Sequence, residues 1–288
     1  PVQLDALQRD NPHWDFREDF DPNQWVFVFL HGYVDNTGAD RIAFKLAALG
    51  YQVYLLRYPF LKGVRELGNM VKEAMEAIHQ MESGKRLVPV GHSLGGFIWD
   101  EVLLNAPDIV ERYRIPLYLP LGSPHFGTLA AYVAIGQSAQ DMRPNSDVVR
   151  AHRVLSFPDS LEVYSIVSRF DMLVVPIETA LLKSGINYIL SETGHIGQVI
   201  SSRSVLAIEE IISTNPEVLL KRSTHRQFYP SSLCRALGWL PSAWRRHVAV
   251  DSIFTNLSED SKDERLRLRV VHREMALGVF PRLNRPKA

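Results

Sequence analysis

Cysteine is almost missing from this sequence: Cys234 stands alone among 288 residues, so no disulfide forms within the chain. No run of 18 or more apolar residues occurs, so the sequence predicts no transmembrane helix. With 46% apolar and 22% charged residues, and no internal repeat, the composition excludes a collagen, a coiled-coil rod and a largely disordered chain. What remains is a globular protein large enough to bury its own core.

The sequence starts at Pro1 with no signal peptide before it, so we expect no secretory signal. Together with the single cysteine, this favours a reducing compartment. We therefore expect a cytoplasmic protein, or one from which a targeting segment has been removed.

The chain carries no net charge, because 32 basic residues balance 32 acidic ones, and this argues against a nucleic-acid partner. The balance is uneven along the sequence. Residues 1–220 carry 26 acidic and 18 basic groups, whereas residues 221–288 carry 14 basic and 6 acidic groups. Residues 262–273 mix arginine with Leu and Val, and we expect a helix that packs its apolar face on the body rather than a peripheral contact with a membrane surface. Nothing indicates an oligomeric state.

Residues 25–215 alternate short apolar runs with longer amphipathic stretches, as βαβ units do. The pattern predicts an α/β fold with a mainly parallel sheet flanked by helices. The expected strands are 25–30, 51–57, 86–90, 115–121, 161–167 and 186–190. The expected helices are 38–49, 66–81, 93–105 and 204–212, with Met70, Ala74, Ala77, Ile78 and Met81 on the buried face of the second.

Three segments fall outside this alternation. Residues 1–24 are polar and rich in Asp and Pro, and we expect them to form a surface arm. Residues 216–288 form a basic extension, for which we expect loosely packed helices. Residues 127–150, small and apolar at their start, form a candidate lid.

The strongest motif is Gly91-His92-Ser93-Leu94-Gly95-Gly96, which matches G-x-S-x-G between a strand and a helix. A sharp turn of this kind presents a serine hydroxyl to substrate, and glycines on either side relieve the crowding of the backbone. Ser93 is therefore the candidate nucleophile, and the amide of Leu94, at the helix start, a candidate oxyanion donor. The alternative is a glycine-rich turn in which Ser93 only caps the helix.

The strand at residues 25–30 runs into His31-Gly32-Tyr33. An oxyanion hole needs a second N–H from the loop after this strand, and we expect the Tyr33 amide to supply it. A glycine at position 32 lets the backbone approach closely, although an ordinary strand exit has the same sequence features.

The acid and the base should follow the last two strands, in the chain order Ser, Asp, His. Asp171 comes just after strand 161–167, and His195 comes after strand 186–190, between two glycines. His195 would take the proton of Ser93, and Asp171 would hold its imidazole in the required tautomer. Asp159 and Glu178 are the rival acids, but Asp159 precedes its strand and Glu178 lies farther from the strand end.

These motifs together resemble a family, the bacterial triacylglycerol lipases of the α/β-hydrolase fold, and the related deacylases of glycosylphosphatidylinositol lipids. The stretches that carry the resemblance are His31-Gly32, the serine motif, Gly122-Ser123-Pro124-His125-Phe126-Gly127-Thr128, residues 140–146 and Gly194-His195. The likeness covers residues 24–215. It implies an α/β-hydrolase domain with a lid inserted after the sixth strand of the family's sheet, and a C-terminal extension beyond it.

The resemblance implies hydrolysis of a small-molecule or lipid ester through an acyl-enzyme on Ser93. This chain differs from many secreted lipases because it has no disulfide and no match to their calcium-binding carboxylates. We therefore expect no cofactor and no metal. Two alternatives stay open. The same triad could transfer the acyl group to another acceptor, or the chain could be a binding protein on a hydrolase fold.

Overall fold

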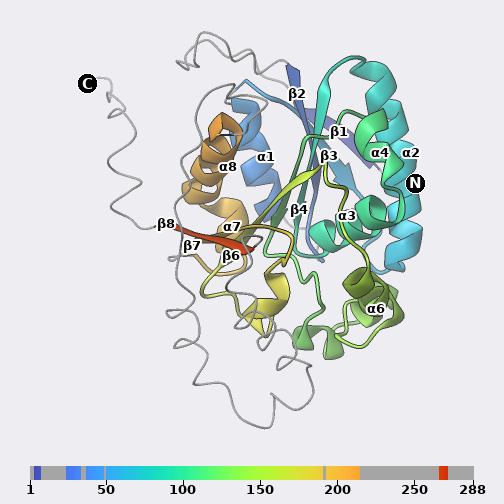
Figure 1. The fold of residues 1–288 in the computed structure, drawn as a ribbon, viewed down its shortest axis with the longest axis vertical. Coiled ribbons are helices and arrows are strands. Elements are labelled where there is room, and N and C mark those ends of the chain that lie inside the picture. The colour runs from blue at the N-terminus through green and yellow to red at the C-terminus, as the bar shows by residue number, and fades with distance from the viewer. Residues whose placement is uncertain are drawn as a thin grey trace.

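A computed structural model describes residues 3–7, 24–33, 37–48, 50–190, 193–214 and 266–271 of the chain. Its strands form one sheet in the order β1-β3-β2-β4-β5-β6-β7-β8 (Figure 1). Neighbouring strands are parallel except for the antiparallel pair β1 and β3. The strands are β1 Gln3–Leu7, β2 Trp25–Leu30, β3 Gln52–Arg57, β4 Arg86–His92, β5 Leu117–Leu121, β6 Glu162–Ser168, β7 Gly185–Leu190 and β8 Leu266–Val271.

The inner strands form because their sequences are continuous runs of β-branched, aromatic and leucine residues, which suit a sheet covered on both faces. In β2 every residue is buried. Helices cover the two faces, with α1, α7 and α8 on one side and α2, α3 and α4 on the other (Figure 1). The helices are α1 Thr37–Ala48, α2 Val64–Met81, α3 Leu94–Asn105, α4 Asp108–Arg112, α7 Gly197–Ile200 and α8 Ser202–Thr214.

The α/β fold predicted from the sequence is confirmed, and the expected strands between residues 25 and 190 lie within two residues of their observed bounds. The buried face predicted for α2 was partly wrong: Ile78 is buried as expected, and Met70 and Ala74 are only partly buried. The buried residues include Val64, Leu67, Val71, Met75 and Ile78, whereas Met81 is 56% exposed. The helix begins two residues earlier than expected, and its branched and longer side chains bury more apolar surface than alanines do.

The expectations for the two ends of the chain were partly wrong. Residues 3–7, expected in a surface arm, form the edge strand β1 beside β3. Residues 266–271, expected in a helix, form β8, which pairs with β7 in parallel. Their sequence, LRLRVV, begins with the alternation of apolar and polar residues that is typical of a strand. The rest of both segments lies outside the described residues.

The candidate lid, residues 127–150, follows β5 in the described part of the chain. It contains η2 Leu129–Tyr132, α5 Gln137–Asp141 and the beginning of α6 Asp147–Val154. It packs on the body, since α5 contacts α2 and α6 contacts α3. Whether the segment moves as a lid stays a prediction.

The parallel strands place the candidate site at one edge of the sheet. The registers pair Leu30 with Gly91, His92 with Leu121 and Ser168 with Leu190. The loops after β2, β4, β6 and β7 therefore leave the sheet at the same edge.

Candidate active site

Ser93 stands between β4 and α3 in a backbone conformation that is rare for a residue with a side chain. Its φ is 53° and its ψ is −118°. The residue occupies the N-cap position of α3, yet its hydroxyl accepts no hydrogen bond from the helix amides. The capping role considered above is therefore not what the hydroxyl does. Strained residues of this kind are concentrated at functional sites.

The glycines around Ser93 allow this turn because separate backbone segments approach each other very closely there. A Cβ on Gly91 would lie 2.4 Å from the nitrogen of Gly96. A Cβ on Gly95 would lie 2.3 Å from the carbonyl oxygen of Leu30, at the end of β2. Both distances are shorter than any real carbon contact, so only glycine fits at either position.

The loop after β2 lies against the serine turn. A Cβ on Gly32 would be 3.5 Å from the Cβ of Ser93 and 3.0 Å from Nδ1 of His92. Leu94 is the first residue of α3, where amides have no partner within the helix. Tyr33 follows Gly32, and its hydroxyl is hydrogen-bonded to the backbone of Ile135 in the candidate lid. The two expected oxyanion donors, the amides of Tyr33 and Leu94, thus belong to segments that meet at Ser93.

His195 and Asp171 are in direct contact, with Nδ1 of the imidazole 2.7 Å from Oδ2 of the carboxylate. Both side chains are buried. The other carboxylate oxygen accepts hydrogen bonds from the amides of Leu173 at 2.9 Å and Val174 at 2.8 Å. Because Asp171 is held by backbone amides and paired with His195, a buried negative charge is well supported there.

His92 connects the serine turn to the loop that carries His195. Its ring centroid lies 4.6 Å from that of His195, and its Nε2 donates to the His195 carbonyl oxygen at 3.2 Å. Burial holds the pKa of His92 well below its usual range, and the nearby His195 lowers it further. His92 is therefore a neutral hydrogen-bond donor. Through this contact it holds His195 close to the serine turn.

Among the described residues, the structure brings His195 together with Asp171. Among these residues, His195 makes no hydrogen bond to either rival acid, Asp159 or Glu178. The Ser93 hydroxyl makes no hydrogen bond to His195 in this part of the chain. Such bonds are often long before substrate binds. The carboxylate oxygens of Glu178 are buried and have no partner among the described residues.

A second Asp, His and Ser set lies in the interior. Nδ1 of His125 is 2.6 Å from Oδ2 of Asp100, and its Nε2 is 3.2 Å from Oγ of Ser165. These three residues are at most 2% exposed. The Ser165 hydroxyl donates to the carbonyl oxygen of Ala180 at 2.8 Å. A hydroxyl that is buried and already donating has no access to an ester, so this set ties α3, β6 and η3 Ile177–Ala180 together as a structural network.

Sequence reasoning missed one residue of the site, Gln198. Its side-chain amide donates to Oδ2 of Asp171 at 3.1 Å, and the side chain is fully buried. The signal available in the sequence was its position, three residues after His195, where a helical turn brings a side chain back over the same face.

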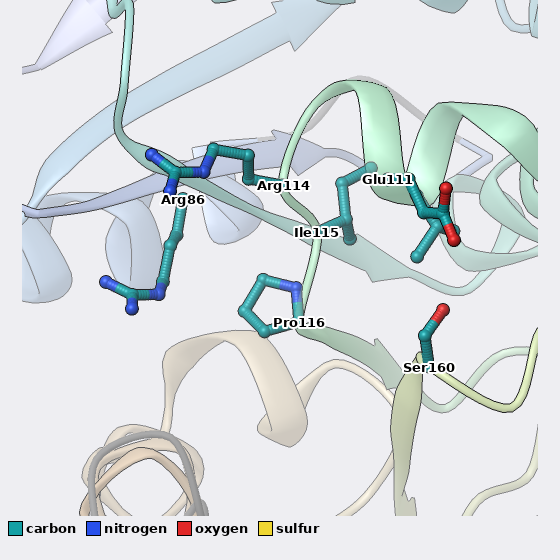
Figure 2. A pocket seen from close by; sticks show the side chains of 7 residues that line it. Arg86, Glu111, Arg114, Ile115, Pro116 and Ser160 are labelled. Atoms are coloured by element: carbon teal, nitrogen blue, oxygen red, sulfur yellow. The ribbon is translucent and has the colours of Figure 1, made fainter.

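A surface hollow lies elsewhere, between the starts of β4 and β6 (Figure 2). Arg86 and Arg114 line it together with Ile115, Pro116 and Ser160. The guanidinium of Arg86 lies over the Trp25 ring, and Arg114 donates to the carbonyl oxygen of Gly84 at 2.6 Å. Because these arginines are engaged at the amino end of the strands, the hollow is separate from the serine turn.

No group of three or more His, Cys, Asp or Glu side chains in the described ranges could hold a metal ion. In the same ranges no helix is both long enough and apolar enough to cross a membrane.

No protein-family model and no curated protein matches the sequence. Solved structures match its fold. The mature lipase BlEst2 of Bacillus licheniformis matches with a TM-score of 0.54 at 16% identity, over 73% of this chain and 97% of that one. The monoacylglycerol lipase of Paleococcus ferrophilus matches with a TM-score of 0.52 at 14% identity, over 74% of this chain and 99% of that one.

Lipase B of Aspergillus fumigatus matches with a TM-score of 0.60 at 15% identity, over 73% of this chain and 56% of that one. The match thus spans little more than half of the fungal enzyme. The chain therefore shares the fold of these lipases, the α/β-hydrolase fold.

Proposed function

We propose that this protein is a serine hydrolase that cleaves carboxylic esters of hydrophobic acyl chains through Ser93, His195 and Asp171. The observation that carries the proposal is the pair formed by His195 and Asp171, beside a strained serine turn whose hydroxyl caps no helix. The lipases and esterases that share the fold support the same reaction class.

The contact between Nδ1 of His195 and Asp171 leaves Nε2 as the nitrogen that takes the serine proton. The Ser93 oxygen then attacks the ester carbonyl carbon, and its proton passes to Nε2. The carbonyl π electrons move to the oxygen, where the amides of Leu94 and Tyr33 stabilise the charge. Collapse of this intermediate breaks the bond to the alcohol, which leaves with the proton from Nε2.

A water molecule completes the cycle. His195 takes its proton while the hydroxide attacks the acyl carbon, and the carboxylic acid leaves as Ser93 regains its hydrogen. Asp171 keeps its contact with Nδ1 throughout and stabilises the imidazolium that forms twice in each turnover.

Exposed apolar side chains around the site favour a hydrophobic acyl chain. Met172 is 82% exposed on the loop that carries Asp171, and Ile196 follows His195. Val133 is 89% exposed in the candidate lid, which is fixed to the Asp171 loop by a hydrogen bond from Thr128 Oγ1 to the Leu173 carbonyl oxygen at 2.6 Å. Apolar exposure of this kind is typical of a surface that binds an apolar partner or substrate.

The test is labelling with a fluorophosphonate probe, which reacts with an activated serine. We expect wild-type protein to be labelled at Ser93 and the Ser93→Ala variant to be unlabelled. Ser165→Ala is the matched control, since Ser165 belongs to the buried set, and it should be labelled at Ser93 as the wild type is. Folded wild-type protein that is not labelled would contradict the proposal.

A panel of esters of increasing chain length then defines the substrate, with Ser93→Ala as the blank. We expect turnover to favour medium or long acyl chains over acetate. Added alcohol separates hydrolysis from acyl transfer: free acid as the main product supports the hydrolase, whereas a new ester as the main product assigns the same site to a transferase.

A further inference from the structure

The carboxylate of Asp171 receives four hydrogen bonds, two on each oxygen. The amides of Leu173 and Val174 donate to Oδ1. On Oδ2, His195 Nδ1 lies at 2.7 Å and Gln198 Nε2 at 3.1 Å. Gln198 is thus the one side chain besides His195 that touches this carboxylate through a hydrogen bond among the described residues. It reaches the same oxygen that pairs with the imidazole.

The chain brings Gln198 there by a single turn after His195. The backbone amide of Gln198 donates to the carbonyl oxygens of Gly194 at 3.2 Å and His195 at 3.3 Å. This turn carries the side chain inward, where it is fully buried. The loop that positions the base therefore also supplies a donor to the acid.

Gly122, after β5, leaves the room that the amide needs. Its φ is 52°, and a Cβ there would lie 2.4 Å from Gln198 Nε2 and 3.1 Å from Asp171 Oδ2. Any side chain at position 122 would push the amide away from the carboxylate. The contact therefore depends on three loops, those after β5, β6 and β7.

The orientation of the amide is set by this contact. A carboxylate only accepts hydrogen bonds, so the NH₂ group faces Asp171. The oxygen of the same amide, Gln198 Oε1, is buried and has no partner among the described residues. A buried acceptor without a donor destabilises a fold, and an apolar residue would avoid that cost. The glutamine at this position is therefore better explained by its hydrogen bond to the Asp171 carboxylate than by packing of the buried side chain.

We propose that Gln198 is a positioning residue for the acid and base pair: it holds Oδ2 of Asp171 in line with Nδ1 of His195 and stabilises the charge of the carboxylate. This role rests on the proposed hydrolase function. Gln198 touches no reacting atom and acts on the reaction through Asp171.

The test compares steady-state kinetics on a soluble p-nitrophenyl ester. Gln198→Met keeps the length of the side chain and removes the donor. We expect kcat to fall by about 10- to 100-fold, the range for a hydrogen bond to a charged group, with KM within about twofold of wild type. Gln80→Met makes the same change on the exposed side of α2 and should leave both constants unchanged.

Gln198→Glu gives a second readout, a dependence on pH, which a purely structural role would not produce. A carboxyl group at this buried position shares its site with the Asp171 carboxylate, so its pKa is raised and it is protonated at lower pH. The protonated group donates to Oδ2 as the Gln198 amide does, so kcat relative to wild type should be retained at low pH and fall as pH rises. Gly122→Ala should reproduce the loss in kcat without changing residue 198, because its Cβ occupies the place of the amide.

Wild-type kcat in Gln198→Met, together with a ratio of Gln198→Glu kcat to wild-type kcat that does not change with pH, would overturn the role of Gln198. If both variants at position 198 fail to fold, wild-type kcat in Gly122→Ala would overturn it equally. Failure of the proposed function is distinct, since wild-type protein would then not be labelled at Ser93 at all.

Discussion

The imidazole of His92 lies against that of His195, with ring centroids 4.6 Å apart, and donates through Nε2 to the His195 carbonyl oxygen. One residue of the serine turn thus holds the backbone of the candidate base. Ser93 follows His92 directly in the chain. The contact between His92 and His195 therefore helps to place the nucleophile relative to the base, in addition to any effect of bound substrate.

Replacing His92 by Phe keeps a ring in this place and removes the donor. The His195 carbonyl oxygen then loses a hydrogen bond worth about 1 kcal/mol, and the loop gains freedom. We expect kcat on a soluble ester to fall by about 2- to 13-fold. His79→Phe, on α2, is the matched control and should keep wild-type kcat. Equal kcat in both variants would mean that the contact does not position the base.

The same substitution has a pH signature in stability. Folded His92 stays neutral because burial lowers its pKa, whereas in the unfolded chain it titrates near its ordinary value of about 6.5. Below that pH the unfolded state binds more protons at this residue, so the contribution of His92 to stability falls on acidification. Measured by urea unfolding, the free energy of unfolding of His92→Phe relative to wild type should therefore rise between about pH 8 and about pH 5. A difference between the two proteins that does not change with pH would show that His92 is not held neutral.

Gly95→Ala tests the close approach between α3 and the end of β2. The added Cβ would lie 2.3 Å from the Leu30 carbonyl oxygen and 2.5 Å from that of His31, and neither backbone atom can rotate away. We expect the free energy of unfolding to fall by about 3 kcal/mol or more, with loss of probe labelling. The measurement is urea unfolding followed by labelling of the soluble fraction.

Gly68→Ala is the control for that variant, because it also adds one methyl group at a helical glycine. At position 68 the nearest atom is Cγ of Glu101 at 3.3 Å, in a flexible side chain. Alanine also favours a helix over glycine, so the change in stability should stay within about 1 kcal/mol. Similar losses in both variants would contradict the close approach inferred at Gly95.

Tyr33→Phe tests the link between the candidate lid and the oxyanion loop. The amide of Ile135 donates to the Tyr33 hydroxyl at 3.0 Å. Removing the hydroxyl should speed hydrogen exchange at the Ile135 amide by about 2- to 13-fold, the equivalent of one neutral hydrogen bond. The Tyr33 amide is unchanged, so kcat on a soluble ester should stay within about threefold.

Tyr132→Phe is its matched control, since Tyr132 is a half-exposed tyrosine of the same segment. It should leave exchange at Ile135 as in wild type. If Tyr33→Phe leaves that exchange unchanged as well, the hydroxyl does not hold the segment closed.

The inner strands and the serine turn could be predicted from the sequence because local rules govern them. A run such as WVFVFL suits a buried strand, and only glycine fits beside a crowded turn such as the one at Ser93. Asp171 and His195 could be ranked because parallel strands end at one edge. Gln198 could not, since its contact with Asp171 depends on the missing side chain of Gly122, which is distant in the sequence but adjacent in space. Strand β8 was missed because Arg and Leu mixed in a short segment suit either a helix or an edge strand.

Glu178 gives the last prediction, on stability and pH. The side chain is 1% exposed, and neither carboxylate oxygen has a partner among the described residues. Burial raises its pKa from 4.5 to about 7. Between these two values the folded state binds more protons than the unfolded state, so stability falls as pH rises through this window and stays lower above it. The loss from this one group is on the order of 3 kcal/mol.

Glu178→Gln removes the titration and keeps the shape. We expect its free energy of unfolding relative to that of wild type to rise between about pH 5 and about pH 8, measured by urea unfolding. Glu209, whose pKa burial also raises to about 7, contributes in the same direction and is unchanged in this variant. Glu73→Gln, on the exposed side of α2, should keep the wild-type dependence on pH. If Glu178→Gln keeps it too, Glu178 is already ionised in the folded protein at pH 5, and a cation or donor must reach it there.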